Sequence, residues 1–193
     1  MPQWNNRDLV LYHGTDHLSV LGAAAAAVGA PAQRTTIAPS QGSHVPFPVS
    51  LSLCRPMTDF GQGFYTTTRL HQARQWANSR VRRILAPAGQ QPQAIVLRFT
   101  LSRNRVASLD TLAFVRAMPD YWRLVTDCRN GFPPHQRGRP DEYDIVYGPV
   151  ALPLQQLVIQ DCDQISFHTH RALSVLGTNP MVQGVAPLPN GLF

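Results

Sequence analysis

The chain has 193 residues, of which 44% are hydrophobic, so it is long enough for one domain with a buried core. It contains no apolar run of transmembrane length, and its three cysteines are too few and too far apart for a disulfide framework or a structural zinc site. The formal net charge is +6, and all 17 basic residues are arginine.

Short apolar runs between turn residues predict strands at 9–12, 49–53, 64–68, 94–101, 143–150 and 164–168. Apolar residues at three- and four-residue steps predict helices at 18–30, 69–85, 109–128 and 170–176. We expect Pro119 to split or kink the third helix. Strands and helices without strict alternation indicate an α+β fold. A single domain is expected over residues 1–177, followed by an extended or disordered tail over 178–193.

The arginine-only composition has three explanations, and the sequence leaves them open. Guanidinium groups bind phosphate through paired hydrogen bonds, which suits a polyanionic substrate or partner. A GC-biased genome gives the same excess of arginine. Lysine is the ubiquitin acceptor, so its absence also suits a protein that must survive in a eukaryotic cytosol after delivery.

Residues 59–68 (DFGQGFYTTT) carry the strongest local pattern, a glycine-rich turn that leads into a strand and then a helix. Two glycines around one glutamine allow a tight turn or the close approach of a ligand. Tyr65 then lies where a ligand can rest against its ring. Such turns are also common as plain structure, so the functional interpretation depends on the segments that accompany this one.

Four segments in this order resemble the mono-ADP-ribosyltransferase superfamily, in its diphtheria-toxin and PARP-like branch, and within it a mostly bacterial group. They are Tyr12-His13-Gly14, Asp59 to Thr67, Asp144 to Val150 and Gln164 to His168. The resemblance covers about residues 9–176. It implies a split β-sandwich with a few flanking helices and NAD⁺ as cosubstrate in the cleft between two sheets.

The branch has a His-Tyr-Glu signature on three separate strands, which implies catalytic roles for His13, Tyr65 and Gln164. His13 would bind the adenine-side ribose, the Gly14 backbone would hold the carboxamide, and Tyr65 would stack on the nicotinamide ring. Phe64 or Tyr147 would line the same wall. The full set implied to bind NAD⁺ is Tyr12, His13, Gly14, Thr15, Gly63, Phe64, Tyr65 and Tyr147.

The third signature position holds Gln164 where the family has a glutamate. A glutamine supplies the hydrogen bond to the ribose but not the charge that stabilises a cationic sugar. Asp161 or Asp163 is a candidate source of that negative charge.

Other polar residues have weaker patterns. His168 and His170 have the spacing of a metal pair but lack further ligands, so no metal is expected. The candidates for binding the diphosphate are Arg55, Arg69 and Arg74, and the histidines expected at the surface are His17, His44, His71 and His135.

Three functions remain open. The first is transfer of ADP-ribose from NAD⁺ to a protein or nucleic acid by a toxin or delivered effector, which would have a neutralising partner protein. The second is NAD⁺ hydrolysis with water as acceptor, and the third is a non-catalytic module that binds NAD or nucleic acid. In each case we expect a soluble protein without a membrane span, acting in its own cytosol or in that of a host cell.

Overall fold

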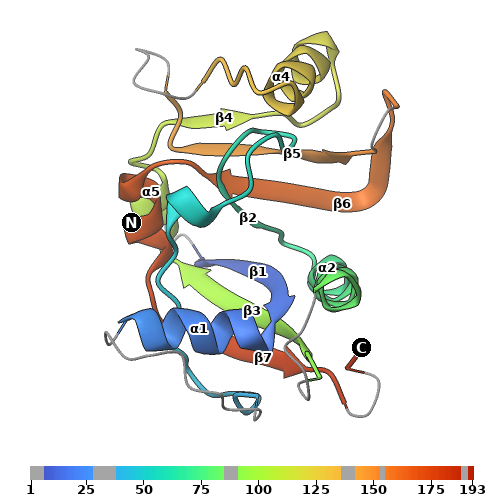
Figure 1. Cartoon of the computed structure of the whole chain (residues 1–193). Coiled ribbons are helices and arrows are strands. Elements are labelled where there is room, and N and C mark those ends of the chain that lie inside the picture. The colour runs from blue at the N-terminus through green and yellow to red at the C-terminus, as the bar shows by residue number, and fades with distance from the viewer. Residues whose placement is uncertain (1–6, 28–37, 85–90, 136–141, 153–154, 188–190) are drawn as a thin grey trace. The chain divides into compact units, whose positions relative to one another are not determined.

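The computed structural model describes residues 7–27, 38–84, 91–135, 142–152, 155–187 and 191–193, and its elements are labelled in Figure 1. The chain divides into two compact units that interleave along the sequence and are described separately. Unit 1 comprises Met1–Leu9, Ser50–Thr68 and Leu101–Leu176, and unit 2 comprises Val10–Val49, Arg69–Thr100 and Gly177–Phe193. Each unit contains one β-sheet and helices, so the protein is α+β.

Unit 2 contains a three-stranded sheet in the order β1-β3-β7. The strands are β1 (Leu9–Asp16), β3 (Ala94–Leu101) and β7 (Met181–Val185), and β3 and β7 are antiparallel. The central strand is a nearly continuous apolar run, AIVLRFTL, as expected for a strand covered on both faces. The helices of this unit are α1 (His17–Ala27) and α2 (Leu70–Arg83).

Small side chains let α2 lie close to this sheet. Ala73 and Ala77 on the helix are fully buried and pack with Ala94, Val96 and Ala186. The apolar residues at three- and four-residue steps therefore do face a core, as the periodicity predicts.

Unit 1 contains a four-stranded sheet in the order β2-β6-β5-β4. The strands are β2 (Phe64–Thr66), β6 (Val158–Phe167), β5 (Ile145–Ala151) and β4 (Thr111–Ala113). β6 pairs antiparallel with β2 and β5, whereas β4 and β5 are parallel. The helical segments are the 3-10 turn η1 (Leu51–Leu53), α3 (Arg103–Val106), α4 (Pro119–Arg129) and α5 (His170–Leu176).

The core of unit 1 surrounds Phe60, which comes from the glycine-rich turn and is fully buried. The Tyr121 ring of α4 meets the Phe60 ring edge-on, with 6.1 Å between centroids. Val146 of β5 and Leu124 of α4 belong to the same cluster. The turn is therefore anchored in the core by its aromatic residue.

Three expectations are wrong. The segment 109–128 is helical only from Pro119, because proline suits the first turn of a helix and β4 precedes it. Residues 51–53 form a 3-10 turn, not a strand. Part of the expected tail forms β7, where Val182 is fully buried and Pro180 and Pro187 flank the strand.

Residues 1–177, expected as a single domain, contribute to both units, and Gly177 begins the last segment of unit 2. Residues 28–30 of the expected first helix and residue 85 of the second lie outside the described part of the chain. Within that part, no helix is both long and apolar enough to cross a membrane.

Candidate functional site

The two glycines of the central turn are needed for different reasons. Gly61 has a φ of 77°, a conformation that favours glycine. Gly63 lies against the imidazole of His168, since a Cβ at this position would be 2.7 Å from Nδ1. The Gly-x-Gly pattern is thus accounted for by folding alone, which is the plain-structure interpretation of this segment.

The same turn fixes Tyr65. Its hydroxyl lies 2.6 Å from Thr58 Oγ1, accepts a hydrogen bond from the Phe60 N–H at 2.9 Å and donates to the Gly61 carbonyl at 2.9 Å. The ring is stacked with the Phe60 ring, with centroids 6.4 Å apart and planes 17° apart. Burial raises the pKa of Tyr65 above its ordinary value, so the phenol stays neutral.

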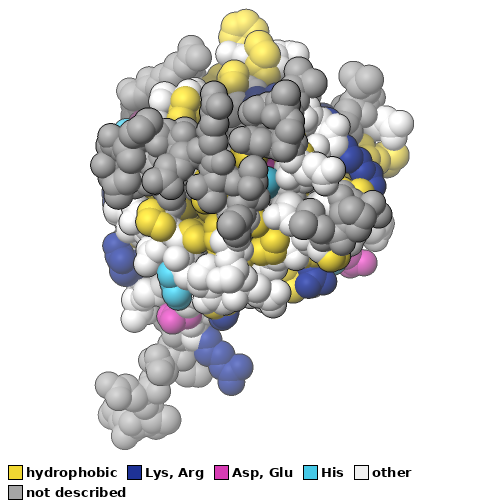
Figure 2. All heavy atoms as spheres, turned by 60° about the horizontal axis from the view of Figure 1, so that its bottom comes forward, with side chains coloured by type: hydrophobic (Ala, Val, Ile, Leu, Met, Phe, Trp, Pro, Cys, Tyr) yellow, Lys and Arg dark blue, Asp and Glu magenta, His cyan; other side chains and the backbone are white. Residues whose placement is uncertain are grey.

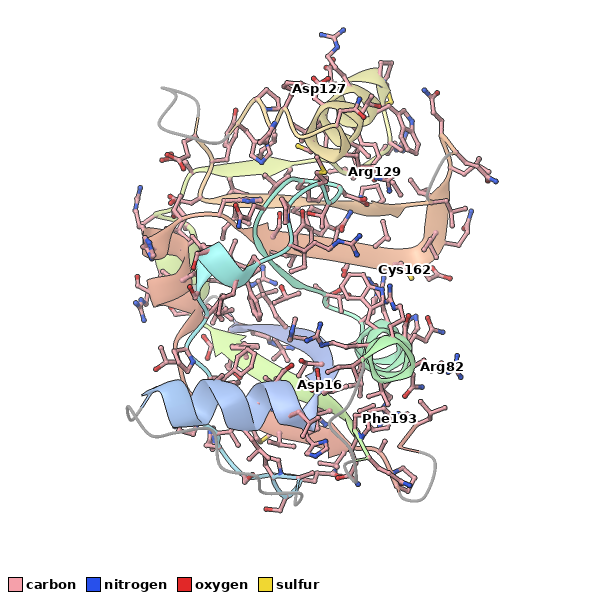
Figure 3. The ribbon with its side chains drawn as sticks, in the orientation of Figure 1. Asp16, Arg82, Asp127, Arg129, Cys162 and Phe193 are labelled. Carbon is pink, nitrogen blue, oxygen red and sulfur yellow. The ribbon has the colours of Figure 1, made fainter. Side chains whose placement is uncertain are left out.

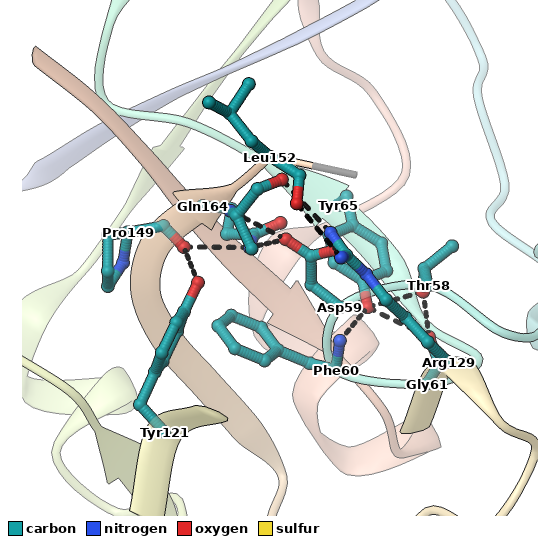
Figure 4. Close-up of polar contacts among 11 residues, drawn as sticks. Thr58, Asp59, Phe60, Gly61, Tyr65, Tyr121, Arg129, Pro149, Leu152 and Gln164 are labelled. Carbon is teal, nitrogen blue, oxygen red and sulfur yellow. Dashed lines mark hydrogen bonds and ion pairs between the residues drawn. The ribbon is translucent and has the colours of Figure 1, made fainter. Parts of the chain in front are cut away.

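A buried carboxylate lies at the centre of the polar contacts in unit 1 (Figure 4). Asp59 Oδ1 accepts hydrogen bonds from Arg129 Nε at 3.0 Å and Nη2 at 2.7 Å. Asp59 Oδ2 accepts from the Ala151 N–H at 3.0 Å and from Gln164 Nε2 at 2.7 Å. Asp59 therefore ties the turn to α4, β5 and β6.

Gln164, which is predicted to be catalytic, forms hydrogen bonds within this network. Its side-chain nitrogen donates to Asp59 and also to the Pro149 carbonyl at 2.9 Å. Only 3% of the residue is exposed. Because both amide hydrogens are used, Gln164 cannot donate to a ligand without breaking one of these bonds. Its catalytic role stays a prediction.

The negative charge next to Gln164 comes from Asp59, which sequence reasoning missed. Arg129 is 70 positions away in the sequence, so no local pattern relates the two residues. Asp163, one of the candidates, instead accepts hydrogen bonds from Thr67 Oγ1 at 2.6 Å and the Thr68 N–H at 2.8 Å. Asp161, the other candidate, lies two residues before Asp163 in β6. Its side chain is exposed, and its backbone has a positive φ of 54°.

A row of buried groups lies beside the turn. His168 Nδ1 is 3.0 Å from the Gln62 carbonyl, so Nδ1 carries the proton, and Nε2 accepts from Ser166 Oγ at 2.7 Å. The His135 ring meets the His168 ring edge-on at 5.0 Å, and Cys128 Sγ lies 3.8 Å from His135 Nδ1.

These groups are poor acid–base catalysts at neutral pH. Burial lowers the pKa of His168 and of His135 to about 4 and raises the pKa of the Cys128 thiol to about 12. His135 was expected at the surface, and so was His17, but they are 3% and 1% exposed. Among the described residues, no three His, Cys, Asp or Glu side chains are arranged to hold a metal ion.

A cavity of about 290 Å³ opens in unit 1 next to this row. Its described lining includes Met57, Gln62, Cys128, Glu142 and His168. The residues predicted to bind NAD⁺ are not among the described residues that line it.

In unit 2, Gly14 marks the closest approach of β1 and α2. A Cβ at Gly14 would lie 2.0 Å from the Ala73 carbonyl oxygen and 2.7 Å from the Ala77 nitrogen. His13, one residue earlier, is half-buried, and its ring centroid is 6.1 Å from that of Phe47. Gly14 thus has a packing reason that is independent of any ligand.

The end of β1 is fixed by Asp16. Its carboxylate accepts from the Ser19 N–H at 2.8 Å and the Ser19 hydroxyl at 2.7 Å, and Arg80 Nε donates to it at 2.6 Å. Burial acts to raise the pKa of Asp16, but the hydrogen bonds from Ser19 and Arg80 outweigh it and the pKa is lowered. Thr15, predicted to lie beside the ligand, is 3% exposed.

The structure brings one group of the predicted residues together in unit 1. Tyr65 pairs with Ser166 across β2 and β6, two positions from Gln164, and Tyr147 of β5 pairs with Ile165. Phe64 belongs to the same sheet and is 6% exposed. The other predicted residues, Tyr12, His13, Gly14 and Thr15, belong to the separately described unit 2.

Comparisons with known proteins give one match. A comparison with curated proteins and a comparison with solved structures both find none. One family model covers residues 42–159, a span that includes the central turn, Tyr65 and Arg129 but not His13 or Gln164. Since the match extends over more than half of the sequence, the chain belongs to the family described as "Protein of unknown function (DUF3990)".

Proposed function

We propose that the protein is an NAD-dependent mono-ADP-ribosyltransferase that transfers ADP-ribose to a macromolecule, acting as a toxin or delivered effector. The observation that carries the proposal is the way in which Tyr65 is held. Three hydrogen-bonding contacts fix its hydroxyl, Phe60 stacks against its ring, and the residue as a whole is partly buried. A fixed aromatic ring suits a planar pyridinium cation, as in nicotinamide linked to ribose.

The arrangement of strands supports the same proposal. A split β-sandwich of two small sheets is expected, and the chain contains a three-stranded and a four-stranded sheet. His13, Tyr65 and Gln164 lie on β1, β2 and β6, three separate strands.

The proposed reaction breaks the bond between nicotinamide nitrogen and ribose C1′, and the bonding electron pair leaves with neutral nicotinamide. A nucleophilic oxygen or nitrogen of the acceptor then bonds to C1′ and loses its proton to solvent. The protein accelerates this reaction only through contacts that strengthen as positive charge develops on the sugar. Tyr65 would hold the leaving group, and His13 would hold the adenine-side ribose.

A second candidate is a non-catalytic NAD-binding module, and the state of Gln164 favours it. Its amide is buried and bonded to Asp59 and Pro149, and amide groups carry no charge to stabilise a cationic sugar.

The experiment is to measure nicotinamide release from adenylate-labelled NAD⁺ by the purified protein, with and without cell lysate. The transferase predicts release that depends on lysate, with label entering a macromolecule. His13→Ala should abolish release, whereas His44→Ala, at an exposed histidine of the same unit, should not.

The other outcomes overturn the proposal in favour of its alternatives. Equal release without lysate identifies an NAD glycohydrolase. No release under either condition, with NAD⁺ bound, identifies the binding module.

A further inference from the structure

The charge of the protein is concentrated in one unit. Unit 2 carries seven arginines and a single acidic residue, Asp16, whereas unit 1 carries ten arginines and ten acidic residues. The entire formal surplus of +6 therefore belongs to unit 2. The difference between the units comes from the acidic residues, because arginine is about equally frequent in both.

Within unit 2 the charge gathers on α2, which contains four arginines and no acidic residue. Arg80 is neutralised by Asp16 at 2.6 Å. None of the described carboxylates forms an ion pair with Arg74, Arg82 or Arg83. All three are exposed, and Figure 3 shows Arg82 beside α2 on the side away from Asp16.

The outward face of α2 is polar along its length. Residues three and four apart share this face, which holds His71, Arg74, Gln75, Asn78 and Arg82. At 1.5 Å per residue, Arg74 and Arg82 are about 12 Å apart along the axis, close to the width of the major groove of DNA. Arg83 flanks this face and is oriented by Ser79, whose carbonyl accepts from Nε at 3.0 Å.

One aromatic ring adjoins this face. The Arg74 guanidinium lies 5.2 Å from the centroid of the Phe193 ring, and Asn78 Oδ1 accepts from the Phe193 N–H at 2.9 Å. Figure 3 shows Phe193 beside α2. In the face that Figure 2 shows, arginine side chains stand out at the edge and acidic ones are few.

The side chains on this face indicate which class of anionic partner it binds: an acidic protein, a membrane or a nucleic acid. Protein interfaces depend on exposed aromatic or aliphatic anchors, and helices that lie on membranes need an apolar outer face. Of the exposed large hydrophobic residues described, none belongs to α2 and only Phe193 adjoins its outward face, where it is 38% exposed and lies against Arg74. Guanidinium groups interleaved with amide and imidazole side chains instead match phosphate oxygens. We propose that the outward face of α2, with Arg74, Arg82 and Arg83, binds the phosphate backbone of nucleic acid.

The test is fluorescence anisotropy of the full chain with a fluorescein-labelled DNA duplex of mixed sequence and about 20 base pairs, between about 50 and 200 mM salt. Each phosphate contact contributes about 0.9 to the slope of log K against log salt. The double variant Arg82→Gln/Arg83→Gln should therefore lower the slope by about 2 and weaken binding at every salt concentration.

The matched control is Arg116→Gln/Arg123→Gln, which removes the same charge from exposed arginines of unit 1. It should leave the slope unchanged, and both variants should unfold thermally like the wild type. Equal slopes for the two variants, or no binding at the lowest salt concentration, would overturn the proposal. Displacement of the duplex by polyglutamate as readily as by unlabelled duplex would also overturn it, in favour of an acidic protein. None of these readouts depends on NAD⁺.

Discussion

The Asp59 carboxylate receives hydrogen bonds from α4, β5 and β6, and it is the residue on which the local geometry of unit 1 depends. A buried carboxylate is stable only when its acceptor sites are filled, and Arg129 supplies the compensating charge. Gln164 fits this arrangement because an amide nitrogen can donate to a carboxylate, which a glutamate at this position cannot do when ionised.

Gln164→Glu is expected to lower the free energy of unfolding by about 2–3 kcal/mol, because it places a second carboxylate where an amide lies 2.7 Å from Asp59. Urea denaturation at neutral pH measures this effect. The double variant Asp59→Asn/Gln164→Glu, in which an amide again faces a carboxylate, should recover part of the loss. A Gln164→Glu protein as stable as the wild type would contradict this view of the network.

The two facing imidazoles predict acid sensitivity. His135 and His168 have folded-state pKa values lowered to about 4, whereas an unfolded histidine has a pKa of about 6.5. Between these values the unfolded chain binds more protons. The stability that they contribute is therefore present above about pH 6.5 and is lost as the pH falls toward 4, at up to about 3 kcal/mol per histidine.

The measurement is the free energy of unfolding at about pH 7 and about pH 4.5. His135→Phe should roughly halve the fall in the free energy of unfolding between these two pH values, since it removes one of the two titrating groups. It also removes a buried Nε2 that has no hydrogen-bond partner among the described residues. A pH dependence that is identical in this variant would contradict the assignment.

At the scale of elements, two features of the sequence predicted structure well. β3 (Ala94–Leu101) and α5 (His170–Leu176) have the bounds expected from periodicity, because turn residues limit them and local preference agrees with the final packing. The parallel strand β4 and the strand β7 were missed, since their pairing partners are distant in the sequence. Side-chain patterns do not encode such non-local pairing for strands of three to five residues.

In the candidate site too, local features could be predicted from the sequence and contacts between distant residues could not. The turn and the strand that carries Tyr65 were predictable from glycine spacing and β-branched residues. The role of Asp59 was not, because its partners Arg129 and Gln164 are 70 and 105 positions away.

Close packing of β1 on α2 predicts that Gly14→Ala is destabilising. The added Cβ would lie 2.0 Å from the Ala73 carbonyl oxygen, which belongs to the backbone and cannot turn away. We expect the free energy of unfolding to fall by about 3 kcal/mol or more. The matched control is Gly22→Ala within α1, where a new Cβ meets nothing within 4 Å. That change should stabilise the protein by about 0.5–1 kcal/mol. Equal effects of the two substitutions would contradict the packing account.

At the scale of the whole molecule, the two units differ in chemical character. Unit 1 is electrically balanced and contains the polar network around Asp59, whereas unit 2 carries the net charge and the basic face of α2. The nucleic-acid proposal rests on α2 of unit 2, whereas the observation that carries the NAD⁺ proposal, the way in which Tyr65 is held, belongs to unit 1. The two proposals can therefore be tested and can fail independently.

The measurement that tests the central proposal most directly is calorimetric titration of NAD⁺ into the wild-type protein, Tyr65→Phe and Tyr65→Leu. Tyr65→Phe keeps the ring and loses only the hydroxyl contacts within the turn, so NAD⁺ should still bind. Tyr65→Leu removes the aromatic face, and binding should weaken about tenfold or more, which corresponds to about 1.4 kcal/mol. If the wild type does not bind NAD⁺, or if Tyr65→Leu binds it as tightly as the wild type, the proposed role of this site is wrong.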